Sequence, residues 1–520
     1  MTFHHRTGSL RGLSLALAMG AAALALHPAT AQAGQADNSL VVALGTDLVM
    51  ADPANGALGT DIPVLYTLYD RLLDFAPEDL SLKPMLATEW SWSDDRKTLT
   101  LKLRQDVKFH DGTDFNAEAV KRSLEFFKES GVNRDINGVT KIEVVDPFTI
   151  ALTSETPNSS LPGLLAERAG MIISPAAIEK WGKEKLTQNP VGTGPFKMRN
   201  HEVGSAVFVE RFADYWDKDK QTVDLIEFRV IKNPASAVSA MMTGQIDYLP
   251  SIDPINMPAL SRNPAIRVAQ EPTIGYGVVQ FNAALAPVDK AEVRRAISMS
   301  IDREEIAAAV YGGNVQTKGA VLPVPPSYWP STPGLDTLAY NPDGAKKLLA
   351  EAGYPNGISF KMCLNANAGM PQPAVKVADI MREQMKPAGI TLETEEVAAN
   401  SACVETFVRQ KKLPAFLVTW SGRPDPAITY AQILATDSFY NVGGKPWGNR
   451  ADELVRQLQA TEDRDAQDKI YDELNKVFVD EVPMMPLYFF VNVVAYNAKL
   501  TGEEPNLLGR PYVRNLHWKK

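Results

Sequence analysis

The chain is 520 residues long, and its 62 acidic and 53 basic side chains give a formal net charge of −9 at pH 7. An acidic chain with evenly mixed charges argues against nucleic-acid binding. Because this length exceeds what one hydrophobic core organises, we expect at least two lobes.

The first 33 residues have the pattern of a secretory signal peptide. Arg6 and Arg11 give a positive start, Leu13 to Leu26 form an apolar core, and Ala31 and Ala33 each complete a small-residue cleavage site. The alternative is a membrane anchor, but this run is short for a bilayer span and no other stretch approaches about 18 apolar residues. We predict cleavage after Ala31 or Ala33, which removes two arginines and takes the charge from −9 to −11.

Cys363 and Cys403 are the only cysteines, and neither lies near the leader, which excludes lipid attachment to an N-terminal cysteine. An exported protein without an anchor suits a Gram-negative periplasm. That compartment is oxidising, so the two thiols can pair, and we predict a disulfide between them. They form no CxxC redox motif, and two cysteines alone make no zinc site.

In chain order, the hydrophobic pattern is that of a mixed α/β protein. Residues 39–44 form a short apolar strand, and 90–110 alternate polar and apolar residues as antiparallel strands do. Asn116 then has the position of a helix N-cap. Residues 225–249 follow a β-α-β pattern.

Three later segments begin with patterns that start helices. Asp289 and Asp302 each precede a glutamate by three positions, which is the spacing of a capping box. Asn341 and Pro342, followed by Gly353, predict a helix with a cap, a first-turn proline and a terminal glycine.

The later part of the chain predicts a parallel sheet. Strands and helices alternate there, at 358–364, 373–386, 390–397, 401–411 and 415–420. This order implies right-handed crossovers. If the strand order is 2-1-3, a ligand would sit beyond the carboxyl ends of the first and third strands, at 365–367 and 421–425. Cys363 and Cys403 would lie near the same edge of the sheet.

Five blocks of sequence carry a resemblance to a known family. In order they are Leu86–Trp90 with Ser93–Asp95, Leu103–Gly112, Pro190–Phe196 (PVGTGPF), Asn282–Asp302 and Tyr340–Tyr354. Together they resemble the extracellular solute-binding proteins of family 5, which include the peptide-, opine- and nickel-type receptors of bacterial ABC importers. The blocks span nearly the whole chain after the leader.

This resemblance implies a two-lobed α/β fold of the periplasmic binding protein type (type II) with an accessory domain. Lobe I would comprise 37–62, 189–282 and 486–520, the accessory domain 63–188 and lobe II 283–485. Crossings near 281–282 and 482–483 would form a hinge that closes over the ligand. The partners would be a small polar or peptide ligand and an inner-membrane permease and ATPase, and the protein would be a monomer without a cofactor.

Arg423 is the most informative candidate for ligand binding. In peptide-binding members, the third residue after the tryptophan that corresponds to Trp420 is an aspartate that holds the α-ammonium of the ligand. Arg423 occupies this place, and a cation suits a carboxylate or phosphate instead. The alternative is that Arg423 pairs with Asp425 or lies in solvent. Asp425 precedes Pro426, so it is a turn former or a ligand contact.

The other candidates come from both predicted lobes. Trp420 is either core or an apolar wall of the cleft. Asn365 and Asn367 either form a turn or hydrogen-bond a polar ligand, and the pair Tyr440 and Asn441 begins a loop that would cover it. Thr46 and Asp47 end the first strand and would meet the ligand from the other side, where Asp47 could hold an amine.

The sequence disfavours two other kinds of function. The glycines of Pro190–Phe196 suggest a phosphate loop, but the GK[ST] ending is absent, and a structural turn fits better. After the leader, only His110, His201 and His517 remain, in no catalytic or metal-binding spacing. We predict no enzyme, with a receptor for a chelated metal or haem, or a hydrolase, as alternatives. The predicted ligand is anionic or amphoteric, such as an opine, an acidic or modified peptide, or a glutathione-like conjugate.

Overall fold

The computed structural model describes residues 34–56, 59–133, 135–220, 223–326, 328, 336–366, 373–444, 447–461, 463–504 and 506–519. The predicted signal peptide at 1–33 and the ligand candidate Asn367 lie outside this part of the chain. None of the helices formed by the described residues has the length and apolar character needed to cross a bilayer.

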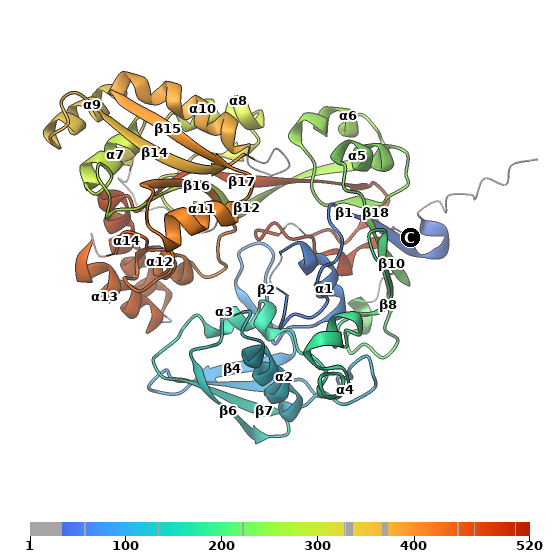
Figure 1. The fold of residues 1–520 in the computed structure, drawn as a ribbon. Helices are drawn as coiled ribbons and strands as arrows, with labels where there is room; N and C mark the ends of the chain where they lie inside the picture. The colour runs from blue at the N-terminus through green and yellow to red at the C-terminus, as the bar shows by residue number, and fades with distance from the viewer. Residues whose placement is uncertain are drawn as a thin grey trace, which may run out of the picture. The chain divides into compact units, whose positions relative to one another are not determined.

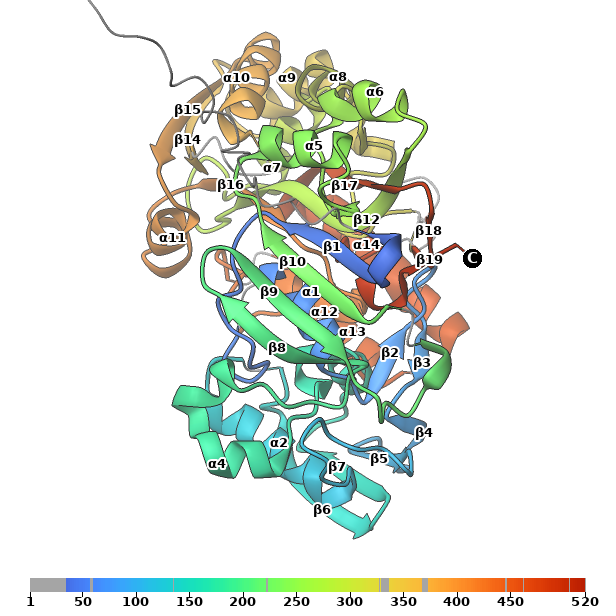
Figure 2. The same ribbon diagram turned by 90° about the vertical axis from the view of Figure 1, so that its right-hand side faces the viewer.

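An eleven-stranded sheet forms the centre of the fold, in the order β15-β14-β16-β12-β17-β11-β1-β10-β9-β8, with β13 paired to β17 off this path (Figure 1). Figure 2 shows β1, β10, β9 and β8 side by side at one end of the sheet. The strands are β1 (Ser39–Leu44), β8 (Phe196–Glu202), β9 (Ala206–Arg211), β10 (Leu225–Val230), β11 (Tyr248–Leu249), β12 (Ile266–Phe281), β13 (Val315–Gln316), β14 (Ile358–Asn365), β15 (Ile390–Val397), β16 (Ala415–Trp420) and β17 (Met484–Asn497).

The helices divide among the proposed domains. They are α1 (Ile62–Leu68), α2 (Ala117–Ser130), α3 (Leu161–Leu165), α4 (Pro175–Lys185), α5 (Pro234–Met242), α6 (Met257–Ser261), α7 (Ala291–Met299), α8 (Arg303–Tyr311), α9 (Pro342–Glu351), α10 (Ala374–Met385), α11 (Asn400–Cys403), α12 (Pro426–Leu434), α13 (Gly448–Gln459) and α14 (Arg464–Glu481). The helix expected at 401–411 is instead the short α11 followed by a π-helical segment at Val404–Arg409.

A separate antiparallel sheet has the order β4-β5-β7-β6, with β4 at Ala87–Trp92, β5 at Thr98–Leu103, β6 at Val139–Asp146 and β7 at Thr149–Ser154. It falls inside the accessory domain predicted at 63–188, whose bounds remain a prediction. Alternate residues of β5 are buried, as the sequence pattern required, but the predicted strand region ends at Leu103 rather than at 110. Helix α2 packs on β6 and β7, and the side chain of Asn116 caps it by accepting a hydrogen bond from Ala119 N at 2.9 Å.

The predicted parallel sheet is confirmed. Strand β14 lies between β15 and β16 and is parallel to both, which is the 2-1-3 order, and α10 packs against β14 and β15. The caps at Asp302 and Asn341 form as predicted. The predicted cap at Asp289 was wrong. Helix α7 begins one residue later than that cap requires, and Lys290 occupies the N-cap position without a side-chain hydrogen bond.

Two large hydrophobic cores divide at the middle of β12 and β17. The first core contains Ile274 of β12 and Val494 of β17, and the second contains Tyr276 and Phe489 of the same strands. The ladder between β12 and β17 shifts register between Pro272 and Tyr276. The division therefore falls inside the two strands, whereas the hinge predicted at 281–282 and 482–483 would lie at one end of them.

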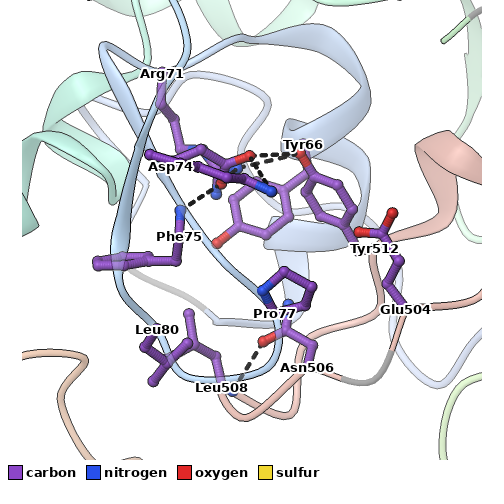
Figure 3. A pocket seen from close by; sticks show the side chains of 11 residues that line it. Tyr66, Arg71, Asp74, Phe75, Pro77, Leu80, Glu504, Asn506, Leu508 and Tyr512 are labelled. Atoms are coloured by element: carbon purple, nitrogen blue, oxygen red, sulfur yellow. Dashed lines mark hydrogen bonds and ion pairs between the residues drawn. The ribbon is translucent and has the colours of Figure 1, made fainter. Parts of the chain in front are cut away.

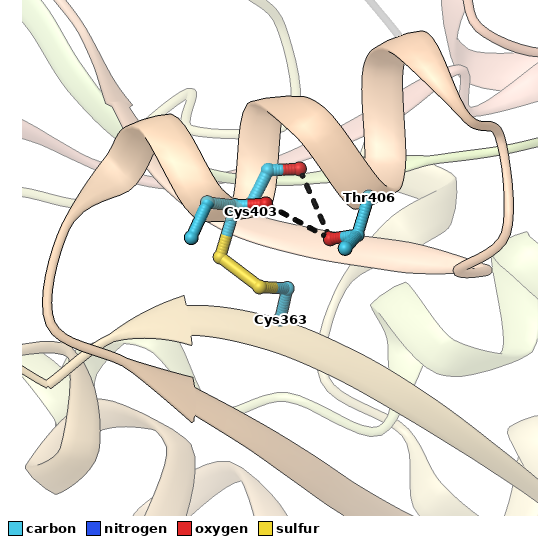
Figure 4. The surroundings of a disulfide bond; sticks show 4 residues. Cys363, Cys403 and Thr406 are labelled. Carbon is cyan, nitrogen blue, oxygen red and sulfur yellow. Dashed lines mark hydrogen bonds between the residues drawn. A yellow bond between two sulfur atoms is a disulfide. The ribbon is translucent and has the colours of Figure 1, made fainter.

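A small third core surrounds the two cysteines. Cys363 near the end of β14 and Cys403 in α11 are joined by a disulfide in this structure, with their Cα atoms 5.8 Å apart (Figure 4). Both are fully buried, together with Phe407 and Phe416. The link ties the helix after β15 to the strand beside it.

Candidate functional site

Strands from the two halves of the sheet point their carboxyl ends toward the same region, the middle of β12 and β17. Strands β1 and β11 are parallel. Strand β11 pairs antiparallel with β17, with Leu249 opposite Ala495, so β1 and β11 both run toward the middle of β17. From the other half, β16 ends at Trp420, which faces Tyr276, and Tyr276 faces Phe489. The break in the β12 ladder therefore lies where a ligand is expected in such a sheet.

Two loops close on this break. Ile274 N donates a hydrogen bond to Leu507 O at 2.8 Å, so the C-terminal loop around 506–510 lies against it. On the other side, Gly422 has a φ of +70°, and a Cβ there would collide with the carbonyl of Ile274. The loop that carries Arg423 therefore lies against the break in the β12 ladder.

Aromatic rings form one wall beside the break. The ring of Trp420 lies 6.2 Å from that of Tyr276 and 5.0 Å from that of Tyr440. Tyr276 is fully buried, whereas Tyr440 is 39% exposed and its neighbour Phe439 is 54% exposed. Trp420 is half-buried, so it joins the core to an exposed aromatic edge. Its contact with a ligand remains a prediction.

Arg423 is half-buried and only loosely bonded. Its Nε donates to Gln432 Oε1 at 3.5 Å, the outer limit of a hydrogen bond. Asp425 does not pair with it, because the Asp425 carboxylate caps α12 by accepting from Ala427 N at 2.8 Å. Burial raises the pKa of Asp425, and the hydrogen bond from Ala427 N opposes that rise.

Other charged groups come from the segments that follow α2 and α3 and from the C-terminal loop. Arg510 Nη1 and Glu167 Oε2 form an ion pair at 2.5 Å. Burial raises the pKa of Asp135, the positive charges of Arg423 and Arg168 act to lower it, and Glu167 acts to raise it. We call Asp135, Glu167, Arg168, Arg423 and Arg510 the cleft cluster. It contains both arginines and carboxylates.

Asp47 and Thr46 have different surroundings. Asp47 accepts hydrogen bonds from His201 Nε2 at 2.9 Å and from Gly204 N at 2.7 Å, so it holds the turn between β8 and β9. Burial acts to raise the pKa of Asp47, but these bonds lower it below its ordinary value. Thr46 is exposed. The structure thus gives Asp47 a local partner set that the sequence did not indicate.

The amide candidates are mostly internal. Asn365 at the end of β14 is 7% exposed, and Asn441 is 5% exposed. Asn441 Nδ2 donates to Leu434 O at 3.4 Å and Ala435 O at 3.1 Å, which holds the end of α12. The backbone oxygen of Tyr440 accepts from Gln280 Nε2 at 2.8 Å, which fixes that loop to β12. These contacts position the loop; ligand contacts by these residues remain predictions.

The glycine-rich block at Pro190–Phe196 is a structural turn. Gly194 N donates to Leu68 O at 3.0 Å, and a Cβ at Gly194 would collide with the backbone of α1. His110 Nε2 bonds to Gly194 O at 3.0 Å, and Gly192 N donates to His110 Nδ1 at 3.3 Å. Burial lowers the pKa of His110 to about 4, so the ring is neutral at pH 7.

A small pocket lies beside the C-terminal loop (Figure 3). Its charged groups bond to one another, because Arg71 pairs with Asp74 and its guanidinium stacks 4.2 Å from the Tyr66 ring. Tyr66 also accepts from Arg510 Nη1 at 3.3 Å, which connects the pocket wall to the cleft cluster. The lining residues are Tyr66, Arg71, Asp74, Phe75, Pro77, Leu80, Lys83, Glu504, Asn506, Leu508 and Tyr512.

The structure adds candidate site residues that the sequence did not single out. Asp135, Glu167, Arg168 and Arg510 belong to no motif, and Glu167 and Arg510 are 343 positions apart. No local pattern marks them, because they meet only after the C-terminal loop folds back. Among the described residues, no group of three or more His, Cys, Asp or Glu side chains is placed to hold a metal ion.

Comparison with known proteins identifies relatives along nearly the whole chain. The profile described as bacterial extracellular solute-binding proteins, family 5 Middle, matches residues 81–441. The glutathione-binding protein GsiB of Escherichia coli O1:K1 / APEC is 29% identical over 490 residues, which cover 90% of this chain and 92% of that protein.

Solved structures agree on the fold. HbpA2 from Haemophilus parasuis superposes with a TM-score of 0.80 at 23% identity, over 93% of this chain and all of that one. A dipeptide binding protein from Pseudoalteromonas sp. SM9913, solved in complex with Met-Leu, gives a TM-score of 0.76 at 25% identity, over 92% of this chain and 100% of that one. The fold class predicted from the five sequence blocks is confirmed.

Proposed function

The chain belongs to family 5 of the bacterial extracellular solute-binding proteins, and from this premise we propose that it captures an anionic or amphoteric solute through Arg423. The solute carries a carboxylate, and small peptides, glutathione-like conjugates and opines are the classes to test first. The protein delivers this ligand unchanged to an inner-membrane ABC permease and its ATPase. It works as a monomer in the periplasm after the leader at 1–33 is cleaved.

Arg423 carries the proposal. Its guanidinium lies on a loop at the carboxyl end of β16, and its one hydrogen bond within the described residues is a long one to Gln432. A half-buried arginine with such a weak partner retains donors for a planar anion. The Asp425 carboxylate, which could have neutralised it, is occupied at the start of α12.

The relatives support the class of ligand. The curated relative is named as a glutathione-binding protein, and one structural neighbour was solved with the dipeptide Met-Leu. Glutathione and dipeptides each carry carboxylates together with an ammonium group. A ligand of this kind matches a cluster that contains both arginines and carboxylates.

The proposed domains follow from the same family. Lobe I comprises 37–62, 189–282 and 486–520, the accessory domain 63–188 and lobe II 283–485. The break in the β12 ladder at 273–275 lies between the two large cores and is where closure over a ligand would bend the sheet. Trp420 and Tyr440 would then cover the apolar part of the ligand.

Calorimetric binding tests this proposal. The ligand is first identified by native mass spectrometry of the purified protein and by a screen of glutathione, dipeptides and opines. Arg423→Ala should then weaken binding by about 2–5 kcal/mol, because the buried anion loses its partner. Arg423→Asp should bind the native ligand still more weakly, because it adds repulsion, and should favour solutes with a free ammonium.

A surface arginine provides the control. Arg456 on α13 pairs with Glu453 at 2.7 Å and is largely exposed, so Arg456→Ala should leave the affinity unchanged. The melting temperature of empty Arg423→Ala should barely move. Unchanged affinity in Arg423→Ala, or a screen that finds only cationic or uncharged ligands, would reject the proposal. A chemically altered ligand after incubation would show turnover and reject a purely capturing role.

A further inference from the structure

We propose that Asp135 binds the ammonium group of the ligand whose carboxylate Arg423 binds, so that the site selects solutes that carry both charges. This inference rests on the proposed function, because it assumes a ligand beside Arg423. It assigns the cationic end of the ligand to the accessory region rather than to Asp47, the residue suggested by the sequence.

The chain on both sides of Asp135 is held by contacts of neighbouring residues. Asn133 Nδ2 donates to Gly56 O at 2.8 Å, and Ser130 Oγ donates to Ala54 O at 2.7 Å. Both bonds tie the end of α2 to the segment at 52–56. A Cβ on Gly56 would lie 2.9 Å from Arg168 Nη1, so this segment is in contact with the cleft cluster. On the other side of Asp135, Ile136 is 2% exposed in the first large core, and a binding group requires such support from its neighbours.

Asp135 lies among charges yet forms no ion pair with them. The positive charges of Arg423 and Arg168 act on the Asp135 carboxylate, but neither side chain hydrogen-bonds to it. Within the part of the chain that the structure describes, no hydrogen bond or ion pair reaches this side chain. Burial raises the pKa of Asp135, and a bound ammonium would supply the missing counter-charge.

The other carboxylates near the site are already engaged. Asp47 is bonded to His201 and Gly204 in the β8–β9 turn. Asp425 caps α12, and Glu167 pairs with Arg510 at 2.5 Å. Removing any of these from its partners would cost a buried hydrogen bond or ion pair. Asp135 can bind an ammonium without that loss.

The two poles come from different parts of the chain. Arg423 follows β16, and Asp135 follows α2. The two regions touch near this point, because a Cβ on Gly163 in α3 would lie 3.9 Å from Asp425 Cβ. A ligand with a carboxylate and an ammonium would therefore bridge the loop after β16 and the loop after α2.

The test pairs a change in the protein with a change in the ligand. Affinities of wild type and Asp135→Asn are measured by calorimetry for glutathione, Met-Leu and an acidic dipeptide, each with a free and an acetylated amino terminus. Wild type should bind the free form roughly 10- to 100-fold more tightly than the acetylated form, the range of a hydrogen bond to a charged group. Asp135→Asn should lose most of this preference.

Two further variants separate charge from structure. Asp135→Glu should retain part of the preference, because it keeps the carboxylate. Glu125→Gln, which removes one negative charge from α2 outside the cleft cluster, should leave the preference unchanged. Melting temperatures of all three variants report whether the fold is intact.

Each outcome decides the matter. A preference for the free amino terminus that disappears only at Asp135 supports the inference. A wild type that needs the ligand carboxylate but binds free and acetylated forms equally overturns the role of Asp135 and leaves the proposed function intact. Equal loss of affinity for both forms in Asp135→Asn overturns it as well. A wild type that binds no carboxylate-bearing solute of the panel overturns both proposals.

Discussion

Two arginines near the C-terminus, four positions apart, have very different surroundings. The guanidinium of Arg514 bonds to Asp70 Oδ1 at 2.6 Å, to the Tyr215 hydroxyl at 2.5 Å and to Tyr66 O at 3.1 Å. The side chains of Arg514 and Asp70 are 3% and 0% exposed. We call these groups the C-terminal anchor, in which one buried cation meets one buried anion and both terminal nitrogens of the guanidinium donate hydrogen bonds.

Arg510 belongs instead to the cleft cluster. Its ion pair with Glu167 is more open, with side chains 22% and 16% exposed. Glu167 Oε1 is buried with no hydrogen-bond partner among the described residues, and Arg423 and Asp135 nearby form no ion pair with each other. A buried polar network in which each charged group has a partner stabilises a fold. A network in which charged groups lack partners is a candidate binding site. The comparison thus separates structural from functional charge.

Replacing Arg514 should produce the largest effect on stability. Arg514→Met leaves Asp70 buried without its cation, so we expect a loss of about 3–5 kcal/mol in the free energy of unfolding. Urea unfolding measures this loss. Arg510→Met should cost less stability and more affinity. If the two variants lost equal stability and equal affinity, the distinction between anchor and cleft cluster would fail.

The disulfide should stabilise the fold without touching the ligand. Closing a loop between cysteines 40 positions apart contributes about 4 kcal/mol in the loop-entropy description. Reductant should therefore lower the urea midpoint of the wild type, but not that of the Cys363→Ser/Cys403→Ser double variant, and ligand affinity should be equal in both. Two titratable thiols in the unreduced, denatured protein would show that no such bond forms.

His110 should make stability depend on pH in the acidic range. Its pKa is about 4 when folded and about 6.5 when unfolded. The unfolded state therefore binds the proton first, so the stabilisation is complete above pH 6.5 and is lost as the pH falls toward 4. The change is at most about 3 kcal/mol. Unfolding free energies of wild type and His110→Gln should converge as the pH falls across this range.

Only a pH-dependent difference between the two proteins tests the neutral state of His110, because the loss of packing or hydrogen bonds alone would lower the stability of His110→Gln equally at every pH. A difference between wild type and His110→Gln that stays constant with pH would contradict a neutral, buried His110.

The sequence predicted what local rules decide. The caps at Asp302 and Asn341 and the 2-1-3 strand order follow from spacing and chain order, and the place of Arg423 follows from the strand that precedes it. Asp289 failed because a capping box does not determine the first helical residue to within one position.

The remaining features depend on contacts between distant segments. Asp47 is engaged by a turn 154 positions later, and Glu167 meets Arg510 across 343 positions. No periodicity or motif encodes such meetings, since they arise from the return of β17 and the C-terminal loop across the sheet. The sequence could therefore single out Arg423 as a candidate, but it could not identify the residues from distant segments that lie near it.

The most direct measurement combines Arg423 with the carboxylates of the ligand. Affinities of wild type and Arg423→Ala are measured by calorimetry for glutathione and for its diester, which keeps the ammonium but has no carboxylate charge. The diester should bind wild type roughly 10- to 100-fold more weakly than glutathione, and this ratio should fall toward one in Arg423→Ala. Equal affinities in the wild type, or the same ratio in both proteins, would contradict anion capture by Arg423.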